Sequence, residues 1–414
     1  MISLLSKLSP EIKQYLVITG NYWAFTLTDG ALRMLVVLHF HSLGYSPLEI
    51  ALLFLFYEIF GVITNLVGGW LGAKFGLNKT MNIGLALQVI ALSMLLVPAS
   101  WLTIAWVMAA QALSGIAKDL NKMSAKSSIK LLIPKDTSTA SQSEQQLYKW
   151  IAILTGSKNA LKGAGFFLGG VLLMALGFSG AVLAMAVGLT LVWILSLVLL
   201  KKDMGKAKNK PKFTDIFSKS RAINYLSAAR MFLFGARDVW FVVALPVFMV
   251  SQMDWEHSYV SAFMALWVIG YGGIQSIAPK ITQRSKNHTP DGKTAFFWAV
   301  LLMTTPALIA LAMMMNVNLE ISLLGGLLVF GALFAVNSSL HSYLIVSYAD
   351  EDGVSLDVGF YYMANAMGRL IGTVLSGWVF QVAGLEACLW ISTVFIGLAA
   401  VLSLALPKHL TIRS

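Results

Sequence analysis

The sequence contains little cysteine and little charge. Its 414 residues include a single cysteine, Cys388, which excludes an internal disulfide and any metal site built from paired thiolates. Only 12% of the residues are charged, and the 19 acidic residues are outnumbered by 30 lysines and arginines. Because a soluble domain needs far more charge on its surface, this composition excludes a water-soluble protein.

Hydrophobic residues take the place of the missing charge. They make up 57% of the chain, and the mean hydropathy is +0.75. Apolar segments of about 20 residues or more, the length that crosses a bilayer, recur along the whole chain. We therefore expect an all-α polytopic membrane protein with twelve transmembrane helices, at residues 15–41, 48–72, 80–98, 101–122, 148–176, 179–200, 223–250, 257–280, 294–315, 320–347, 355–382 and 385–406.

The longest polar interruption divides these segments into two sets of six. It reads KKDMGKAKNKPKFTDIFSKSR and begins at Lys201. We predict an N-terminal six-helix bundle over residues 1–200, a basic cytoplasmic linker over 201–222, and a C-terminal six-helix bundle over 223–414. The short amphipathic lead before the first segment lacks a small-residue cleavage site, so no removable signal peptide is expected.

Lysine and arginine lie almost entirely on one side of the predicted membrane. The loops of the opposite side contain neither residue, and their acids are Asp254, Glu256, Glu320 and Glu386. Positively charged loops stay in the cytoplasm, so both termini are predicted to be cytoplasmic. This topology also accounts for the basic composition, and nucleic acid is therefore not expected as a partner.

The two halves show weak internal similarity. Asn21-Tyr22 precedes Arg33 in the first segment, and Asn224-Tyr225 precedes Arg237 in the seventh at nearly the same spacing. Two related sets of six helices are typical of secondary transporters. In such proteins the substrate site is expected near the midplane between the repeats.

The residues after the second segment resemble a motif of the major facilitator superfamily. They read GGWLGAKFGLNK, in a predicted loop, and Gly69, Leu71, Lys74 and Gly76 fit the family pattern G-x-L-a-D-r-x-G-r-k. Ala73 stands where that pattern has an aspartate. The resemblance implies the major facilitator fold, whereas the missing aspartate removes the family's usual charge relay at this position.

Longer motifs resemble one branch of that superfamily, the bacterial organoarsenical efflux permeases of the ArsJ family. The likeness extends from about Tyr15 to Pro407 and includes NYWAFTLTDGALRMLVVLHFHSLGYSP, GIAKDLNKMSAKSSIKLL, TGSKNALKGAGFFLGG, FGARDVWFVVALPV, NSSLHSYLIVSYA and GVSLDVGFYYMANAMGR. It implies export of 1-arseno-3-phosphoglycerate across the bacterial inner membrane, and hence arsenate resistance. It also implies a functional partnership with a glyceraldehyde-3-phosphate dehydrogenase that makes this compound. The resemblance assigns no binding residue.

Charged residues inside the predicted spans are the candidate functional groups. Lys162 lies about 18–21 Å beyond Tyr148 and Trp150, which mark the cytoplasmic edge of its segment, so it is near the middle of a core about 30 Å thick. A charge at this depth is costly and marks either a transport pathway or a structural ion pair. Both readings stay open for Lys162, and Lys158 is able to reach the interface with its long stem.

Bases outnumber acids in these spans. The acids are Asp29, Glu58, Asp119, Asp238 and Asp357, and the bases are Arg33, Lys118, Lys122, Lys158, Lys162, Arg230, Arg237 and Arg369. An excess of cations suits an oxyanion, which arginine binds with two parallel hydrogen bonds and lysine as a point charge. We predict a substrate-binding set comprising Lys162, Lys158, Arg33, Arg237, Arg369, Lys122 and Lys118. The candidates for proton coupling are Asp29, Asp238 and Glu58.

Local spacing gives further expectations for these charges. Asp29 and Arg33 are four residues apart on a helix and are able to satisfy each other. Arg237 and Asp238 are adjacent and project about 100° apart, so we expect each to face a different partner. Glu58 is expected to be either protonated or paired.

Two more expectations concern helix faces. Lys126 and Lys130 continue the stripe of Lys118 and Lys122, and we expect them to lie on a solvated cytoplasmic face. Gly165 and the glycine four residues later form a small-xxx-small pattern, for which we expect close packing between the two halves.

Other functions receive less support from the sequence. Uptake or exchange of a phosphorylated three-carbon acid would use the same cationic cavity. A non-transporting membrane receptor or scaffold would be favoured by a large extramembrane domain, which the predicted spans leave no room for. We find no Ser/His/Asp, metal-ligand or Walker pattern, so we expect no enzymatic activity, cofactor or metal. The expected partners are an anionic small molecule and the lipid bilayer.

Overall fold

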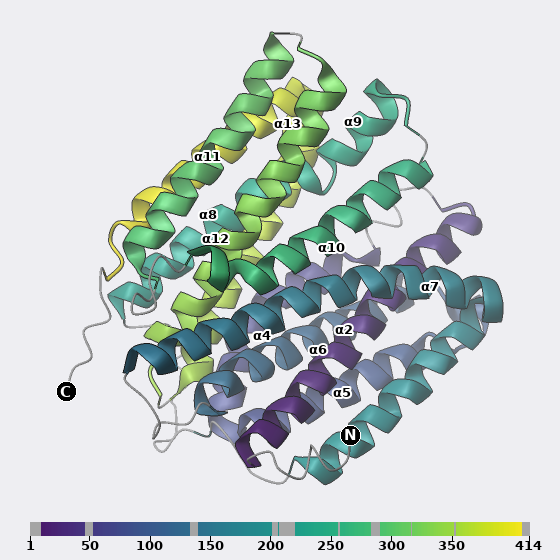
Figure 1. The fold of residues 1–414 in the computed structure, drawn as a ribbon. Coiled ribbons are helices and arrows are strands. Elements are labelled where there is room, and N and C mark those ends of the chain that lie inside the picture. Colours follow the sequence, from purple (N-terminus) through teal and green to yellow (C-terminus); the bar gives the residue numbers. More distant parts are fainter. Residues whose placement is uncertain are drawn as a thin grey trace. The chain divides into compact units, whose positions relative to one another are not determined.

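The structure, a computed structural model, consists of helices packed side by side (Figure 1). It describes residues 10–45, 53–132, 140–200, 206, 220–255, 257–282, 290–315, 317–351 and 353–407. Over these ranges, seven helical stretches are long and apolar enough to cross a membrane. Two of them, Gln145–Leu199 and Val354–Ser403, contain 55 and 50 residues and are each long enough to cross twice.

The helices follow the predicted apolar segments. In the N-terminal part these are α2 (Pro10–Ser42), α4 (Leu55–Phe75), α5 (Leu77–Met94), the 3-10 turn η1 (Ala99–Trp101), α6 (Ile104–Leu132) and α7 (Ala140–Leu199). The C-terminal part contains α8 (Arg221–Phe241), α9 (Ala244–Gln252), α10 (His257–Thr282), α11 (Gly292–Met314), the π-helical turn η3 (Ile321–Gly325), α12 (Gly326–Tyr348) and α13 (Val354–Ser403). The all-α fold is thereby confirmed. Most of the predicted linker, and the start of the second predicted segment, lie outside the described residues.

Two glycines interrupt the longest helices. Gly177 in α7 has φ 66° and Gly384 in α13 has φ 76°, values that favour glycine because other residues are strained there. Each kink falls between two predicted segments, at 148–176 and 179–200 in α7 and at 355–382 and 385–406 in α13. Both helices are therefore long enough to supply two spans each.

The family motif near Gly69 is helical rather than a loop. α4 continues to Phe75, and Gly76 alone joins it to α5, with φ 97°. A one-residue connection of this kind needs a backbone conformation that glycine adopts without strain. The predicted loop was therefore wrong, because the apolar residues of the motif extend the helix to the last turn.

The described residues group into two compact units. The first contains residues 10–132, 157–200 and 349–363, and the second contains 140–156, 220–348 and 364–407. α7 and α13 each contribute residues to both units, with the changes at Gly156/Ser157 and Met363/Ala364. The first turns of α13 accordingly pack with α4 and α6 in the first unit.

Close backbone contacts hold the first unit together. A Cβ atom on Gly165 of α7 would lie 2.5 Å from the Leu27 carbonyl oxygen of α2, and one on Gly115 of α6 would lie 2.7 Å from the Tyr57 oxygen of α4. The helices therefore touch where glycine removes the side chain. The predicted close packing at Gly165 is confirmed, but its partner is α2 of the same unit and not the other half of the chain.

Aromatic side chains fill the second unit. Trp240 packs edge-on against Phe330 with ring centroids 5.0 Å apart, and Trp267 stacks on Tyr271 at 5.8 Å. The Trp267 indole N–H donates to the Leu327 carbonyl at 2.9 Å, which satisfies its polar atom inside the core. This core fixes α8, α10 and α12 relative to each other, and α8 carries the charged residues Arg230, Arg237 and Asp238.

Candidate functional site

In the first unit, the charges of α2 are held by residues of α4. Arg33 forms an ion pair with Glu58, with Nη2 3.1 Å from Oε1. Asp29 accepts a hydrogen bond of 2.8 Å from the Tyr57 hydroxyl. The spacing of Asp29 and Arg33 would allow them to pair with each other, but each contacts a residue of α4 instead. Of the two states expected for Glu58, the structure shows the paired one.

The lysines of α6 share one buried carboxylate. Lys122 Nζ lies 2.6 Å from Asp119 Oδ1, and Lys118 Nζ lies 3.9 Å from Oδ2 of the same residue. Asp119 is buried, with a side chain only 2% exposed. Two lysines of α6 are thus held beside one buried acid.

The next two lysines of α6 differ in exposure. Lys126 is buried, with 3% of its surface exposed, and its Nζ lies 5.1 Å from the centroid of the Tyr362 ring. Lys130 donates to the carbonyl oxygen of Ala349. The expectation was wrong for Lys126, because the start of α13, which is remote in sequence, covers it, while Lys130 remains partly exposed. The Ser355 hydroxyl of the same segment donates to the Gly69 carbonyl of α4 at 2.8 Å.

The lysines of α7 have different surroundings. Lys158 donates to the Asn159 side-chain oxygen at 3.2 Å. Lys162 Nζ lies 5.9 Å from the centroid of the Phe166 ring. Both lysines are partly exposed, and the α2–α7 contact runs beside Lys162, whose carbonyl oxygen would lie 2.7 Å from a Cβ on Gly30. Lys162 therefore lies where α2 and α7 pack closely against each other.

In the second unit, two arginines share the carboxylate of Asp238. Arg237 Nη2 lies 2.5 Å from Oδ1, and Arg369 Nε lies 3.2 Å from Oδ2. The expectation that Arg237 and Asp238 do not pair was wrong, because the long arginine side chain bends round to its neighbour. Asp238 is fully buried, so this cluster too contains two cations for one acid.

Arg230 differs from the other bases of the predicted spans. It donates to the Asn365 side-chain oxygen at 2.9 Å and to the Ser338 carbonyl at 3.1 Å, and it is 3% exposed. By contrast, Arg369 and Arg33 have side chains 28% and 27% exposed. The seven predicted binding residues are all partly exposed, whereas Arg230 is buried and bound by Asn365 and Ser338.

Sequence reasoning missed the aromatic residues that contact these cations. Tyr57 lies 3.7 Å from Lys118 Nζ and 4.9 Å from the Arg33 guanidinium, measured at its ring centroid. No spacing rule predicts such contacts between three helices. The signal for Phe234 was available, because it lies four residues after Arg230 and three before Arg237 on one face of α8.

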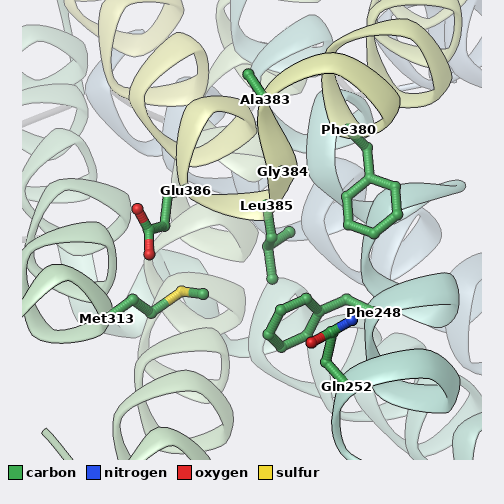
Figure 2. A pocket seen from close by; sticks show the side chains of 8 residues that line it. All are labelled: Phe248, Gln252, Met313, Phe380, Ala383, Gly384, Leu385 and Glu386. Carbon is green, nitrogen blue, oxygen red and sulfur yellow. The ribbon is translucent and has the colours of Figure 1, made fainter. Parts of the chain in front are cut away.

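A pocket of about 400 Å³ lies among residues of the second unit (Figure 2). The kink at Gly384 lies beside it, and Phe248, Phe380 and Met313 supply apolar side chains. Glu386 is its charged residue, so the pocket does not suit an anion. None of the predicted binding residues lines it. Within the described ranges, no group of three or more His, Cys, Asp or Glu residues is arranged to hold a metal ion.

The fold and these charge clusters define a polytopic helical membrane protein with ionised groups inside its bundles. The sequence profile of the Major Facilitator Superfamily matches residues 16–352, and the chain belongs to that superfamily. It is a multi-pass membrane transporter of small solutes. Members of this superfamily are transporters and not enzymes.

Solved structures show the same fold. A bacterial homologue of the iron transporter ferroportin in an outward-facing state has a TM-score of 0.73 and 15% identity, covering 96% of this chain and 99% of that chain. The human organic anion transporter MFSD10 (TETRAN) has a TM-score of 0.73 and 15% identity, covering 96% of this chain and 100% of that chain. The transporter FucP in the outward conformation has a TM-score of 0.71 and 10% identity, covering 95% and 99%. At these identities the likeness concerns the fold alone. A comparison with curated proteins gave no match.

Proposed function

We propose that this transporter exports an organic oxyanion, namely 1-arseno-3-phosphoglycerate, and so provides arsenate resistance. The observation that carries the proposal is the sharing of one buried carboxylate by two cations, at Asp119 and again at Asp238. Each cluster places two cations at one carboxylate in an interior where charges interact strongly. The cations of either cluster would attract an anion.

The types of cation also favour an oxyanion. Arg237 and Arg369 present planar guanidinium groups, which bind phosphate or arsenate oxygens with paired hydrogen bonds. Lys118 and Lys122 present compact ammonium groups that bind such oxygens as point charges. Either kind of group suits a ligand that carries phosphate and arsenate oxygens. The choice of this compound rests on the sequence resemblance to the organoarsenical efflux permeases.

Arsenate resistance tests the proposal in cells. We expect arsenic-sensitive bacteria that co-express the dehydrogenase and this transporter to grow in arsenate and to accumulate less arsenic. Arg369→Gln and Lys162→Ala should each lose this resistance at normal expression, since a hydrogen bond to a charged group contributes about 1.5–3 kcal/mol, equivalent to roughly 10–100-fold in affinity. For Arg369 we expect the lower end, because its side chain is 28% exposed.

Lys74→Gln is the matched control for these variants. Lys74 is also a cation beside an aromatic ring, with Nζ 4.4 Å from the Trp70 centroid, but it lies in the last turn of α4, whereas the α4 residue that approaches Asp119 is Gly61. Lys74→Gln should leave resistance unchanged. Equal resistance in wild type and in both binding-site variants would contradict the proposed site, and no resistance in wild type would contradict the proposed substrate.

Membrane vesicles distinguish export from uptake. We expect everted vesicles to accumulate the freshly made organoarsenical and right-side-out vesicles not to do so. Because the same clusters suit a phosphorylated three-carbon acid, 3-phosphoglycerate is assayed in parallel. Transport of 3-phosphoglycerate alone, into right-side-out vesicles, would replace export by uptake or exchange.

Proton coupling is proposed for Asp29 rather than for Glu58 or Asp238. Asp29 accepts its hydrogen bond from the neutral Tyr57 hydroxyl, whereas Glu58 and Asp238 are ion-paired with arginines. Protonation of Asp29 therefore breaks no ion pair. Asp29→Asn should abolish transport driven by a pH gradient while leaving anion binding in place. Gradient-driven transport that survives this substitution would exclude Asp29 as the coupling group.

A further inference from the structure

The pocket beside Gly384 is built from both parts of an interrupted helix. Gly384 breaks α13 with φ 76°, and Phe380 precedes this break whereas Glu386 follows it. In an unbroken helix, two residues six positions apart project about 120° away from each other. Because the chain changes direction at Gly384, both residues line one pocket of about 400 Å³ (Figure 2). Pockets that bind small molecules have volumes of about 300–1,000 Å³, so this one is large enough for a ligand.

Two further helices of the second unit complete the lining of this pocket. α9 contributes Phe248 and Gln252, and α11 contributes Met313. The side chains of Phe248, Met313 and Phe380 also pack against the hydrophobic core of the unit. The core therefore holds the apolar wall of the pocket in place, as in a binding site that is formed before its ligand enters.

Glu386 brings a carboxylate into these apolar surroundings. The residue is partly buried, and within the part of the chain that the structure describes its side chain forms neither a hydrogen bond nor an ion pair. In Figure 2 the carboxylate lies beside Met313 at one side of the pocket, while the Phe380 ring lies at the other. The pocket therefore offers one negative group and, apart from it, an aromatic surface.

We propose that this pocket binds an organic cation, in which an ammonium group is joined to an apolar part. The ammonium group pairs with Glu386, since opposite charges attract more strongly at a partly buried site than in bulk water. The apolar part lies against Phe248 and Phe380 and removes their rings from water. Such a ligand is opposite in charge to the proposed substrate, so the inference does not depend on the proposed function.

Calorimetric titration of the purified full-length protein tests this inference. The two probes are 2-phenylethylammonium and 2-phenylethanol, which has a neutral hydroxyl in place of the ammonium group. Wild type should bind the ammonium compound more tightly than the alcohol. Glu386→Gln should bind the ammonium compound about fivefold more weakly, a modest loss because solvent screens a partly exposed carboxylate. The same substitution should leave the affinity for 2-phenylethanol unchanged.

A second variant tests the aromatic wall without altering the charge. Phe380→Leu removes a ring from the pocket and should weaken the binding of both probes by about threefold. Glu320→Gln is the matched control, because it neutralises an exposed acid of the second unit that does not line the pocket. Its affinities should equal those of wild type. Equal binding of 2-phenylethylammonium by wild type and Glu386→Gln would overturn the inference, as would equal binding of both probes by wild type.

The bilayer is a second source of this chemistry, because phosphatidylethanolamine also joins an ammonium group to apolar chains. Thermal unfolding in nanodiscs of phosphatidylethanolamine or of phosphatidylglycerol distinguishes the two sources. If the lipid headgroup occupies the pocket, Glu386→Gln should lower Tm in phosphatidylethanolamine but not in phosphatidylglycerol. If the ligand is a free amine, 2-phenylethylammonium should raise the Tm of wild type in phosphatidylglycerol and that of Glu386→Gln less. Neither effect in either lipid would exclude a cation site in this pocket.

Discussion

Asp238 offers the sharpest test of the charge clusters. Asp238→Asn keeps the size of the side chain and removes the negative charge that Arg237 and Arg369 share, at 2.5 and 3.2 Å. Breaking a fully buried pair costs about 3–5 kcal/mol. Arg237 and Arg369 have side chains 16% and 28% exposed, so solvent screens part of the loss. We expect the variant to be less stable than wild type by about 2–3 kcal/mol.

An added anion should restore this loss. In the variant, two cations face each other without their carboxylate, and a bound phosphate group takes its place. A ligand at 100 times its Kd stabilises the folded state by about 2.7 kcal/mol, which is close to the expected loss. The measurement is the thermal unfolding of the purified protein with increasing 3-phosphoglycerate, in wild type and variant. The upward shift in Tm should be larger in the variant.

Asp291→Ala separates charge from general destabilisation. Asp291 is also a buried aspartate of the second unit, 5% exposed, but it caps α11 by accepting the Thr294 backbone N–H at 3.0 Å. Its loss should cost about 0.5–2 kcal/mol, and anions should not restore it. The reasoning is refuted if 3-phosphoglycerate stabilises Asp238→Asn no more than wild type, or stabilises both variants equally.

Three glycine substitutions test the packing of the helices. Gly165→Ala should destabilise the protein by about 1–3 kcal/mol, because its Cβ would lie 2.5 Å from the Leu27 carbonyl oxygen of α2. Gly270→Ala should stabilise it by about 0.5–1 kcal/mol, since the new Cβ meets no atom within 4 Å and alanine favours the helix. Gly177→Ala should cost about 1–2 kcal/mol at φ 66°. Thermal unfolding in detergent measures all three, and a Gly165→Ala variant as stable as Gly270→Ala would contradict the α2–α7 contact.

Local patterns were enough to predict the helices, and they contained the signal for one ring–cation contact that was not predicted. The apolar segments matched the helices because a bilayer span must satisfy its own backbone and needs a fixed length. The breaks between adjacent segments fell at Gly177 and Gly384, where a glycine allows the chain to turn. Phe234 lies between Arg230 and Arg237 on one helix face, and helical periodicity alone places them together.

The partners of the charges depended on contacts between helices. Arg33 is near Asp29 in sequence, but its ion pair is with Glu58 of α4. The lysine stripe of α6 predicted a solvated Lys126, but the start of α13 covers this residue. Periodicity gives the face of a helix, but not the rotation and register of the helix that packs on it.

The amino-acid sequence thus determined that this protein crosses the membrane, where its helices lie and which residues bring charge into the bundles. The tertiary structure decided which charges share a partner. Asp238 joins Arg237 to Arg369, which is 131 residues away, and Tyr57 brings together cations from α2 and α6. The physical reason is that hydrophobicity and periodicity act along the chain, whereas charge pairing in a low dielectric depends on distances of a few ångströms between chain segments remote in sequence.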